Sequence, residues 1–214
     1  MASYTTDYVV CLTSYPARKN NLLTVINSLE MQTVRPHCIY LTLYDGDVEE
    51  MRDVLDTLPY SVIVCRTMED RKVWDKFLPR IANMPSDTAV LVVDDDMIYP
   101  EGMAEEMLET YNRTGDLVSG NDVWRYGYKC HCGCASLIFP KAFEGWSEYI
   151  KHWRELPSSD MFYTMLAAKN GYRYTQSPTN WYKASTPIRT GEAYSQPGMV
   201  KSTYKRTLKL FGWL

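Results

Sequence analysis

The chain has 214 residues, 45% of them hydrophobic and 23% charged, and a formal net charge of −3. This is ordinary globular composition, and the length allows one sizeable core, so we expect a single domain over residues 1–214, either alone or as a fragment of a larger protein. The slightly acidic balance excludes a basic face of the kind that binds nucleic acid.

No apolar stretch approaches the length that crosses a bilayer, and residues 1–7 lack a basic region followed by an apolar core. We therefore expect a soluble, intracellular protein of the cytoplasm, or of the host cytoplasm if the protein is viral. Of the six cysteines, Cys11, Cys38 and Cys65 lie within apolar runs, where a reduced cysteine behaves as a small hydrophobic residue. A disulfide framework is not expected.

The first half of the chain alternates between strand-like and helix-like patterns. Apolar runs predict four strands, at Tyr8–Thr13, Cys38–Tyr44, Ser61–Arg66 and Ala89–Val93. Helical spacing predicts helices between them, at 22–31, Val48–Leu58 and Arg71–Asn83. Three successive β-α units imply an α/β fold, with a mainly parallel central sheet flanked by helices and a Rossmann-like nucleotide-binding half over residues 1–100.

The fourth predicted strand ends in three carboxylates, Asp94, Asp95 and Asp96. In open α/β sheets, ligands bind at the C-terminal ends of the strands. Two ionised carboxylates about 5 Å apart repel by roughly 3 kcal/mol at an effective dielectric constant near 20, so we expect a cation beside them. A hard divalent ion that also binds phosphate oxygens meets this need. The alternative is a solvated acidic turn or a helix N-cap.

The second half, residues 101–214, is less regular. Its patterns predict helices at Glu101–Arg113 and Ser159–Lys169, and strands at Asp116–Gly120, Ala135–Phe139 and Tyr172–Thr175. The segment Gln176–Gly198, rich in Pro, Ser, Thr and Tyr, predicts a surface loop or a lid. The basic, amphipathic segment 201–214 predicts a helix docked on its own domain, a joint to a further domain, or a contact with a membrane or a partner.

The cluster Cys130-His131-Cys132-Gly133-Cys134 invites a zinc interpretation. Alternate residues of a strand place their side chains on opposite faces. No second Cys/His pair lies near the cluster in the sequence, although structural zinc sites use four such ligands. We therefore do not expect zinc here.

Several segments, in their order along the chain, resemble those of a known family. They are Leu12–Arg18, Asp75–Pro79, Val93–Pro100 and Ser158–Asp160, with Asn170–Tyr172 downstream. This family is the GT-A-type, DXD-containing glycosyltransferases, in particular the small inverting transferases of bacteria and large algal viruses. The resemblance spans roughly residues 8–175. It implies a GT-A fold, in which a mixed acceptor-binding half over residues 101–214 follows the nucleotide-sugar-binding half.

The resemblance also implies a nucleotide site at the ends of the first two strands. Thr13, Tyr15 and Arg18 would hold the base. Asp45 would accept the imide hydrogen of uracil, which favours a UDP-linked donor; its alternative role is that of a turn residue before the next helix. Lys76 would reach the diphosphate as a point charge, or else is a solvated lysine on a helix face.

For the acidic triplet, the resemblance implies that Asp94 and Asp95 belong to the nucleotide-binding set, with Asp94 facing the ribose or metal-bound water. Asp96 would bind Mn²⁺ or Mg²⁺, with Asp94 assisting, and the ion would stabilise the departing nucleoside diphosphate. The family often has a late histidine as a further metal ligand, and no histidine follows His152 in this chain. Metal coordination would then rest on Asp96, phosphate and water.

The half that the resemblance assigns to the acceptor contains a second acidic motif, Ser158–Asp160. Asp160 would take the proton from an acceptor hydroxyl, so that a hexosyl or deoxyhexosyl unit passes from the nucleotide sugar to a glycan acceptor with inversion. Its alternative role is to cap the helix that begins there. Asn121, Asp122 and Trp124 lie in a stretch that we expect to touch the donor sugar or the acceptor.

Two other functions stay open. A sugar nucleotidyltransferase also joins an α/β nucleotide-binding half to acidic metal ligands, but it should have a glycine-rich basic loop after its first strand. The corresponding loop here, Ser14–Arg18, contains no glycine. A non-catalytic nucleotide-sugar or carbohydrate-binding domain is the other alternative, and it would not need Asp160.

Overall fold

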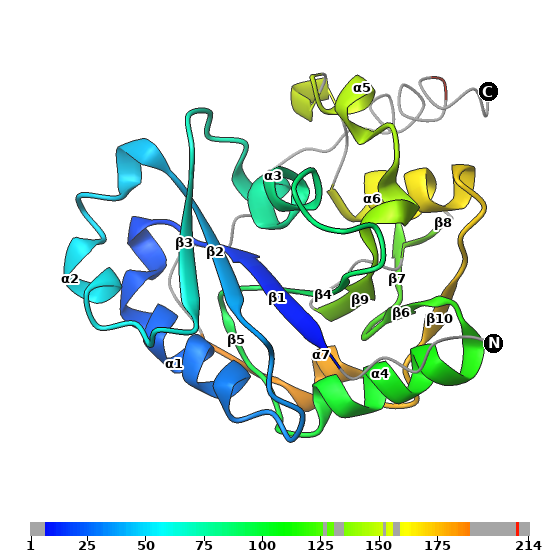
Figure 1. The fold of residues 1–214 in the computed structure, drawn as a ribbon, viewed down its shortest axis with the longest axis horizontal. Helices are drawn as coiled ribbons and strands as arrows, with labels where there is room; N and C mark the ends of the chain where they lie inside the picture. Colours follow the sequence, from blue (N-terminus) through cyan, green and yellow to red (C-terminus); the bar gives the residue numbers. More distant parts are fainter. Residues whose placement is uncertain are drawn as a thin grey trace.

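The computed structural model describes residues 7–125, 128–130, 135–151, 153–155, 159–188 and 209. Seven strands form its central sheet, in the order β10-β6-β9-β4-β1-β2-β3 (Figure 1). These strands are β1 (Tyr8–Thr13), β2 (Ile39–Tyr44), β3 (Val62–Thr67), β4 (Ala89–Val93), β6 (Leu117–Ser119), β9 (Ala135–Ile138) and β10 (Tyr174–Gln176). Two smaller pairs are formed by β5 (Met97–Ile98) with β11 (Thr186–Pro187), and by β7 (Val123–Arg125) with β8 (Tyr128–Cys130).

Strands from the first half of the chain pair in parallel, whereas strands from the second half pair in both directions. β1 pairs in parallel with β2 and with β4, and β2 pairs in parallel with β3. β9 runs antiparallel to β4 and to β6, and β10 is parallel to β6. The predicted α/β class, with a mainly parallel central sheet and a mixed second half, is confirmed.

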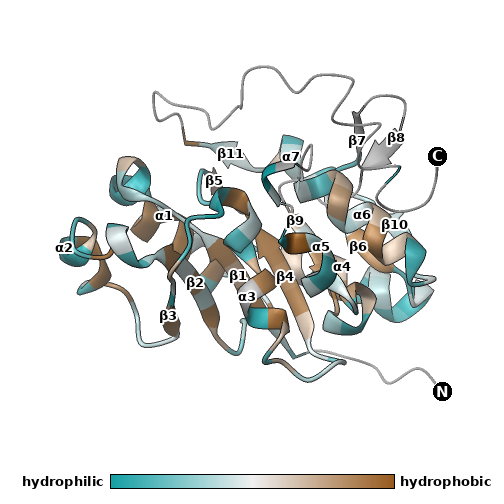
Figure 2. Cartoon of the chain, turned by 90° about the horizontal axis from the view of Figure 1, so that it is seen from above, coloured by the Kyte–Doolittle hydropathy of each residue, from teal (hydrophilic) through white to brown (hydrophobic). Residues whose placement is uncertain are grey.

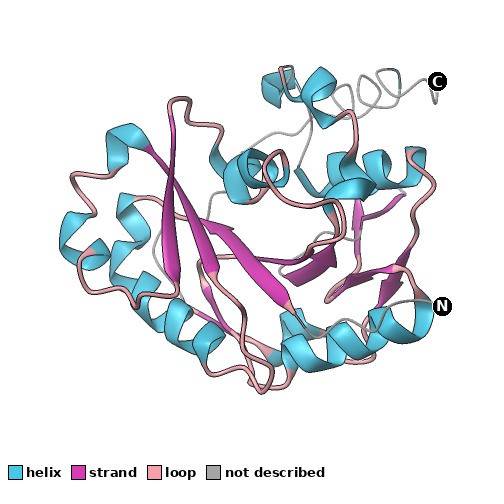
Figure 3. Ribbon diagram, in the orientation of Figure 1, coloured by secondary structure: helices cyan, strands magenta, loops and turns pink. Residues whose placement is uncertain are grey.

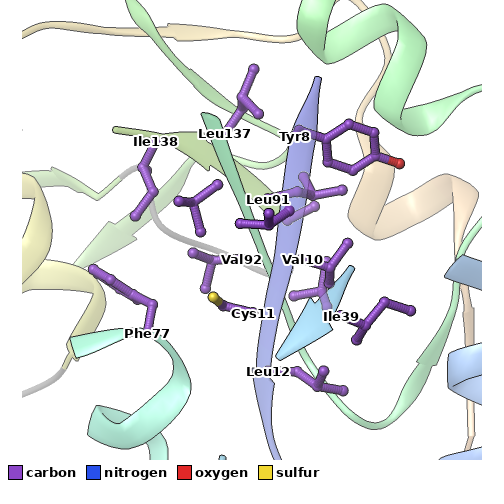
Figure 4. Close-up of a cluster of buried hydrophobic side chains, with 14 of the residues drawn as sticks. Tyr8, Val10, Cys11, Leu12, Ile39, Phe77, Leu91, Val92, Leu137 and Ile138 are labelled. Carbon is purple, nitrogen blue, oxygen red and sulfur yellow. The ribbon is translucent and has the colours of Figure 1, made fainter. Parts of the chain in front are cut away.

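The two central strands are buried on both faces. All five residues of β4 are buried, and so are the first five of the six in β1. Such continuous apolar runs are typical of parallel strands that helices cover on both sides. Figure 4 shows the resulting core around Val10, Leu91 and Phe77, and the brown strands in Figure 2 lie between the more polar helices. The cysteines Cys11, Cys38 and Cys65 are free and buried, as expected.

Helices cover both faces of the sheet, with α1 and α4 along one face and α3 and α6 along the other (Figures 1 and 3). The α-helices are α1 (Lys19–Glu30), α2 (Arg52–Leu55), α3 (Leu78–Ile81), α4 (Met103–Thr114), α5 (Trp146–Ile150), α6 (Ser159–Lys169) and α7 (Trp181–Ala184). Short 3-10 turns are η1 (Pro16–Arg18), η2 (Asp45–Asp47), η3 (Lys72–Lys76), η4 (Pro140–Phe143) and η5 (Trp153–Glu155). Among the described residues, no helix is long and apolar enough to span a membrane.

Three predicted elements differ from the observed ones. The helix predicted at Val48–Leu58 is a single α-helical turn, α2, after the 3-10 turn η2. The helix predicted at Arg71–Asn83 is broken into η3 and α3, because Pro79 in the first turn of α3 has no N–H to continue the preceding turn. The strand predicted at Tyr172–Thr175 begins at Tyr174, because Gly171 adopts a left-handed φ of 83° and the chain turns there.

The segment predicted as a loop or lid, Gln176–Gly198, is described as far as residue 188. This part is folded: it contains α7 and β11, and β11 pairs antiparallel with β5. Residues 189–198 lie outside the described part, as do the cluster residues 131–134 and, except for Lys209, the segment 201–214.

Candidate active site

A pocket of about 520 Å³ opens at the C-terminal ends of β1, β2 and β4, where an α/β sheet is expected to bind its ligand. Its lining brings together most of the predicted nucleotide-site residues, including the whole acidic triplet. The lining residues are Thr13, Ser14, Tyr15, Arg18, Tyr44, Asp47, Asp70, Lys72, Val73, Asp75, Lys76, Asp94, Asp95, Asp96 and Tyr182.

Arg18 links the end of β1 to the acidic triplet. Its Nη1 donates a hydrogen bond to Asp95, and its Nη2 lies 3.0 Å from Oδ2 of Asp96. Arg18 and Asp95 are both buried. Because only two residues separate β1 from η1, and η1 runs directly into α1, Arg18 is fixed at the helix start, where it contacts two of the three carboxylates. A planar guanidinium suits this two-carboxylate contact better than an ammonium would.

Burial disfavours the charged forms of Asp95 and Asp96. Burial raises the pKa of Asp95, although Arg18 and Ser14 act in the opposite direction. Burial and the neighbouring charge of Asp94 raise the pKa of Asp96 as well, and again Arg18 opposes the rise. Oδ2 of Asp95 is buried and accepts no hydrogen bond within the described structure. The cluster is therefore short of positive charge and of donors.

Lys76 provides the second cation of the site. Lys76, at the end of η3, donates a hydrogen bond to Asp94. Burial acts to lower the pKa of Lys76, but the carboxylates of Asp94 and Asp160 outweigh it, and the net effect is a raised pKa. The ammonium group therefore stays charged inside the protein. This is not the solvated helix-face lysine that was the alternative, because its side chain is only 13% exposed.

Asp160 lies in the first turn of α6, close to Lys76. Both residues line a small hollow together with Val92 and Ser136. Aromatic side chains hold η3 against α6: the Trp74 ring packs edge-on against Phe162 and Tyr163. The Tyr163 hydroxyl also donates to the Trp74 carbonyl at 3.2 Å. The structure thus brings the second acidic motif next to the Lys76–Asp94 ion pair.

The backbone around the triplet is held by Tyr99. Its hydroxyl accepts a hydrogen bond from the Asp94 amide (2.8 Å) and donates one to the Asp94 carbonyl (3.1 Å). Tyr99 is buried, so the aromatic ring anchors the loop in the core while its polar end fixes Asp94.

The end of the pocket formed by β1 and β2 differs in detail from the expectation. The Thr13 hydroxyl donates to the Thr42 carbonyl at 2.8 Å, and the Arg18 guanidinium lies 5.4 Å from the centre of the Tyr15 ring. Asp45 pairs with Arg66 at 3.4 Å and does not line the pocket, whereas Asp47, two residues further, does.

Sequence reasoning missed two parts of the lining. The first is the turn after β3, where Lys72 pairs with Asp70 and has a left-handed φ of 58°. A positive φ at a residue other than glycine costs free energy, and such strain often occurs at functional sites. Asp70 and Lys72 follow a strand end, and this position was the available signal. The second part is Tyr182 of α7, which is 56% exposed and for which no local signal existed.

Of the three residues expected to touch the donor sugar or the acceptor, Asn121 contacts the segment that carries Tyr182. Asn121 is buried, and its Oδ1 accepts a hydrogen bond from Asn180 at 3.0 Å. Asp122 is the next residue, partly buried and outside the pocket lining. The backbone of Trp124 lies in β7, and its side chain falls outside the described part. Asn121 therefore contributes to the architecture of this segment.

The carboxylate oxygens of the pocket fit a hard divalent ion that receives most of its ligands from a substrate. Among the described residues, no group of three His, Cys, Asp or Glu side chains is arranged to hold a metal by itself. Asp94 and Asp96 are 29% and 34% exposed and line the same pocket. Magnesium-type sites typically use one or two carboxylates, with phosphate oxygens and water completing the octahedron. Asp94 and Asp96 would be the two carboxylates.

No protein-family model and no curated protein matches the sequence. Solved structures do match. TarS from S. aureus has a TM-score of 0.60 at 11% identity over 96% of this chain, which spans only 39% of the TarS chain. A TarS structure in complex with UDP-GlcNAc has a TM-score of 0.58 at 13% identity, covering 96% of this chain and 65% of that one.

A structure of 4-diphosphocytidyl-2C-methyl-D-erythritol synthase matches with a TM-score of 0.53 at 13% identity, over 95% of this chain and 97% of that one. At these identities the similarity concerns the fold alone. The chain has a mixed α/β fold with a mostly parallel central sheet, of the GT-A-like, Rossmann-type architecture that these nucleotide-binding proteins share.

Proposed function

We propose that this protein is a metal-dependent glycosyltransferase that moves a hexosyl or deoxyhexosyl unit from a UDP-linked sugar to a hydroxyl of a glycan acceptor, with inversion. The observation that carries the proposal is one constellation. Arg18 holds Asp95 and Asp96 at the wall of the pocket, and Lys76 lies between Asp94 and Asp160. In this proposal, these residues would serve a diphosphate, a metal ion and the acceptor's proton at one edge of the sheet.

The charge of the pocket supports a metal requirement. Among the lining residues that the structure describes, six aspartates stand against three basic residues, Arg18, Lys72 and Lys76. A nucleoside diphosphate adds at least two further negative charges, and charges of one sign in a partly buried site repel strongly. Mn²⁺ or Mg²⁺ bound by Asp96 and Asp94 would neutralise this charge and stabilise the departing diphosphate.

The chain's own residues would perform the remaining steps. Lys76 would contact the diphosphate, since its ammonium stays charged, and would hold it beside Asp94. Arg18 would keep the triplet oriented without leaving its two carboxylates. Asp160 would accept the proton of the acceptor hydroxyl as that oxygen attacks the anomeric carbon from the face opposite the leaving group.

The structural similarity supports the donor class. TarS, a glycosyltransferase, shares the fold, and one of its structures holds UDP-GlcNAc. Because this chain spans 39% of the TarS chain, its acceptor is inferred only as a class, a hydroxyl-bearing glycan.

A sugar nucleotidyltransferase is the second candidate, because the diphosphocytidyl-methylerythritol synthase matches over 97% of its own length. Against it stands the loop Ser14–Arg18, which lacks glycine and packs its arginine onto Asp95 and Asp96. An arginine engaged by two carboxylates is poorly placed to receive the triphosphate of an incoming nucleotide.

A donor-hydrolysis screen tests the proposal. The protein is incubated with a panel of nucleotide sugars and Mn²⁺, with EDTA as control, and release of nucleoside diphosphate is measured. A second arm supplies nucleoside triphosphates with sugar phosphates and measures pyrophosphate. Diphosphate release that EDTA abolishes is expected. Pyrophosphate release would favour the nucleotidyltransferase, and UDP binding without any turnover would favour a binding domain.

A further inference from the structure

Tyr182 is an exposed aromatic residue in a pocket whose lining is mostly charged. It lines the pocket and is 56% exposed. The other two tyrosines of the lining have close neighbours. The Arg18 guanidinium lies 5.4 Å from the centre of the Tyr15 ring, and the Tyr44 ring packs so closely on Gly46 that a side chain there would collide with it. The Tyr182 ring therefore offers the pocket an apolar surface for a ligand.

The backbone around Tyr182 is fixed by its neighbours. Trp181 is buried, its amide donates to the Gly120 carbonyl at 2.8 Å, and its indole Nε1 donates to the Ser177 hydroxyl at 3.1 Å. The side chain of Asn180 caps α7 by accepting a hydrogen bond from a backbone amide of that helix. Because the backbone is already held in place, a ligand that binds the ring does not have to order this segment.

The anchor at Gly120 defines the side of the acidic triplet from which Tyr182 reaches the pocket. Gly120 follows β6, and its amide donates to the Ala135 carbonyl of β9 at 2.7 Å. Ala135 in turn lies opposite Val93, the last residue of β4 before the triplet. Trp181 is thus bonded to the chain two strands beyond β4. The ends of β1, β2 and β3, which supply much of the remaining lining, lie on the other side of β4.

This order across the sheet matches the order of the parts in a nucleoside diphosphate sugar. With the base beside Tyr15 at the end of β1 and the diphosphate beside a metal ion at Asp96, the sugar extends past the triplet, away from the base. Tyr182 reaches the pocket from that side. Asp160, the proposed proton acceptor, also lies there, because it shares a small hollow with Ser136 of β9. The sugar would then lie between the metal ion, the proton acceptor and the exposed ring.

We propose that the aromatic ring of Tyr182 stacks against the sugar ring of the donor, which makes Tyr182 a specificity-determining residue for that sugar. This inference rests on the proposed function. A pyranose ring presents C–H groups on its faces and hydroxyl groups around its edge. The charged groups of the pocket can bond the hydroxyls, whereas an aromatic ring removes the C–H groups from water. The two kinds of contact together would orient the anomeric carbon.

Titration calorimetry with UDP, UDP-glucose, UDP-galactose and UDP-GlcNAc, each with Mn²⁺, tests this contact. For each protein, the affinity for the UDP-sugar is divided by the affinity for UDP, which isolates the contribution of the sugar. For the sugar that the parent binds best, Tyr182→Ala should lower this ratio about tenfold. Tyr182→Phe retains the ring and should keep the ratio. Tyr60→Ala, which removes an exposed tyrosine outside the pocket lining, is the control. Circular dichroism checks that each variant is folded.

The outcomes separate this inference from the proposed function. An unchanged ratio in Tyr182→Ala, with UDP still bound, would overturn the stacking contact and leave the glycosyltransferase proposal standing. A ratio that falls equally in Tyr182→Phe would assign the effect to the hydroxyl group and would also overturn stacking. Failure of the parent to bind UDP at all would overturn both proposals.

Saturation-transfer NMR identifies which part of the ligand contacts the ring. Mg²⁺ replaces the paramagnetic Mn²⁺, the aromatic protons of the protein are saturated, and the signals of the bound UDP-sugar are compared between parent and variant. In Tyr182→Ala, the transfer to the sugar protons should fall relative to the transfer to the uracil protons. A loss confined to the uracil protons, or the same pattern in both proteins, would overturn the assignment of Tyr182 to the sugar.

Discussion

The amide of Ile188 donates a hydrogen bond to the carbonyl oxygen of Asp96, with an N···O distance of 2.7 Å. Together with the pairing of β11 with β5, this bond joins the segment 177–188 to the loop of the acidic triplet. The other end of the segment is held by Glu106 of α4, which accepts hydrogen bonds from the Ser177 hydroxyl and from the amide and hydroxyl of Thr179. Tyr182 is thereby held at the pocket from two sides.

Glu106→Gln is expected to loosen this segment. Burial acts to raise the pKa of Glu106, but the hydrogen bonds from Ser177 and Thr179 lower it below its ordinary value of 4.5. The carboxylate therefore stabilises the fold fully above pH 4.5, and this contribution is lost as pH falls through the lowered pKa. Urea denaturation should show a loss of about 1–3 kcal/mol at pH 7 that shrinks at acidic pH.

Glu105→Gln is the matched control, since Glu105 accepts an exposed hydrogen bond from Thr33 on the same helix. The free energy of unfolding of this variant should change by less than about 0.5 kcal/mol. Equal effects of the two substitutions at every pH would contradict the role given to Glu106.

Lys76→Met should destabilise the protein, because it leaves Asp94 without its cation and next to two other aspartates. Removing one partner of a largely buried pair costs about 3 kcal/mol. The double variant Lys76→Met, Asp94→Asn should recover part of this loss, while UDP affinity stays low because the diphosphate has lost its lysine. Urea denaturation and calorimetry separate the two effects. Full recovery of UDP binding in the double variant would remove Lys76 from the nucleotide site.

Asp96→Ala should remain folded and lose the metal dependence of nucleotide binding. Asp96 contributes no core, and Arg18 keeps its contact with Asp95. Calorimetry with UDP, with and without Mn²⁺, measures the effect. Asp87→Ala is the control, because Asp87 is an exposed carboxylate that pairs with Lys141. A Mn²⁺ effect of the parent's size in Asp96→Ala would exclude Asp96 as a ligand.

Asp160→Asn should lower kcat by a factor of about 10²–10⁴, or roughly 3–5 kcal/mol of barrier, because a sugar hydroxyl is a poor nucleophile until its proton leaves. UDP affinity should stay close to that of the parent. Asparagine caps a helix almost as well as aspartate, so a purely capping residue would tolerate the change. NMR of the product's anomeric centre gives the stereochemistry, and retention of configuration would disprove the inverting base.

Asp45→Asn and Asp47→Asn should differ in their effect on UDP binding. Asp47 lines the pocket, whereas Asp45 is paired with Arg66 outside it. If the base lies at this end of the pocket, Asp47→Asn weakens UDP binding several-fold and Asp45→Asn leaves it nearly unchanged. The reverse order would support the contact inferred from the family resemblance. Titration calorimetry of both variants with UDP distinguishes the two outcomes.

The strands were predictable from sequence where burial is continuous. The predicted bounds of β1 and β4 agree with the structure, because apolar runs that end in polar or charged residues leave few alternatives. The pairing of β5 with β11 was not predictable, since two-residue strands have no period and Ile98 meets Thr186 only through the tertiary fold.

The acidic triplet and Lys76 were found because they follow strand ends or recur in a family pattern. Lys72 and Tyr182 were missed for a different reason. Their positions depend on a left-handed turn and on hydrogen bonds between distant segments, and neither leaves a local pattern. The assignment of Asp45 shows the same limit, since a 3-10 turn decides which of two nearby carboxylates reaches the pocket.

Because β9 runs antiparallel to β4, strand direction in the central sheet reverses between them, and we call this boundary the seam. Val93, the last residue of β4, lies opposite Ala135, the first residue of β9. On one side of the seam, residues at the C-terminal ends of the strands line the pocket; on the other, the chain enters the sheet at β9. The pairing of β4 with β9 and the loops that line the pocket therefore do not include the residues that precede β9. If the proposed function is right, substitutions selected before β9 should change acceptor preference and leave nucleotide preference unchanged.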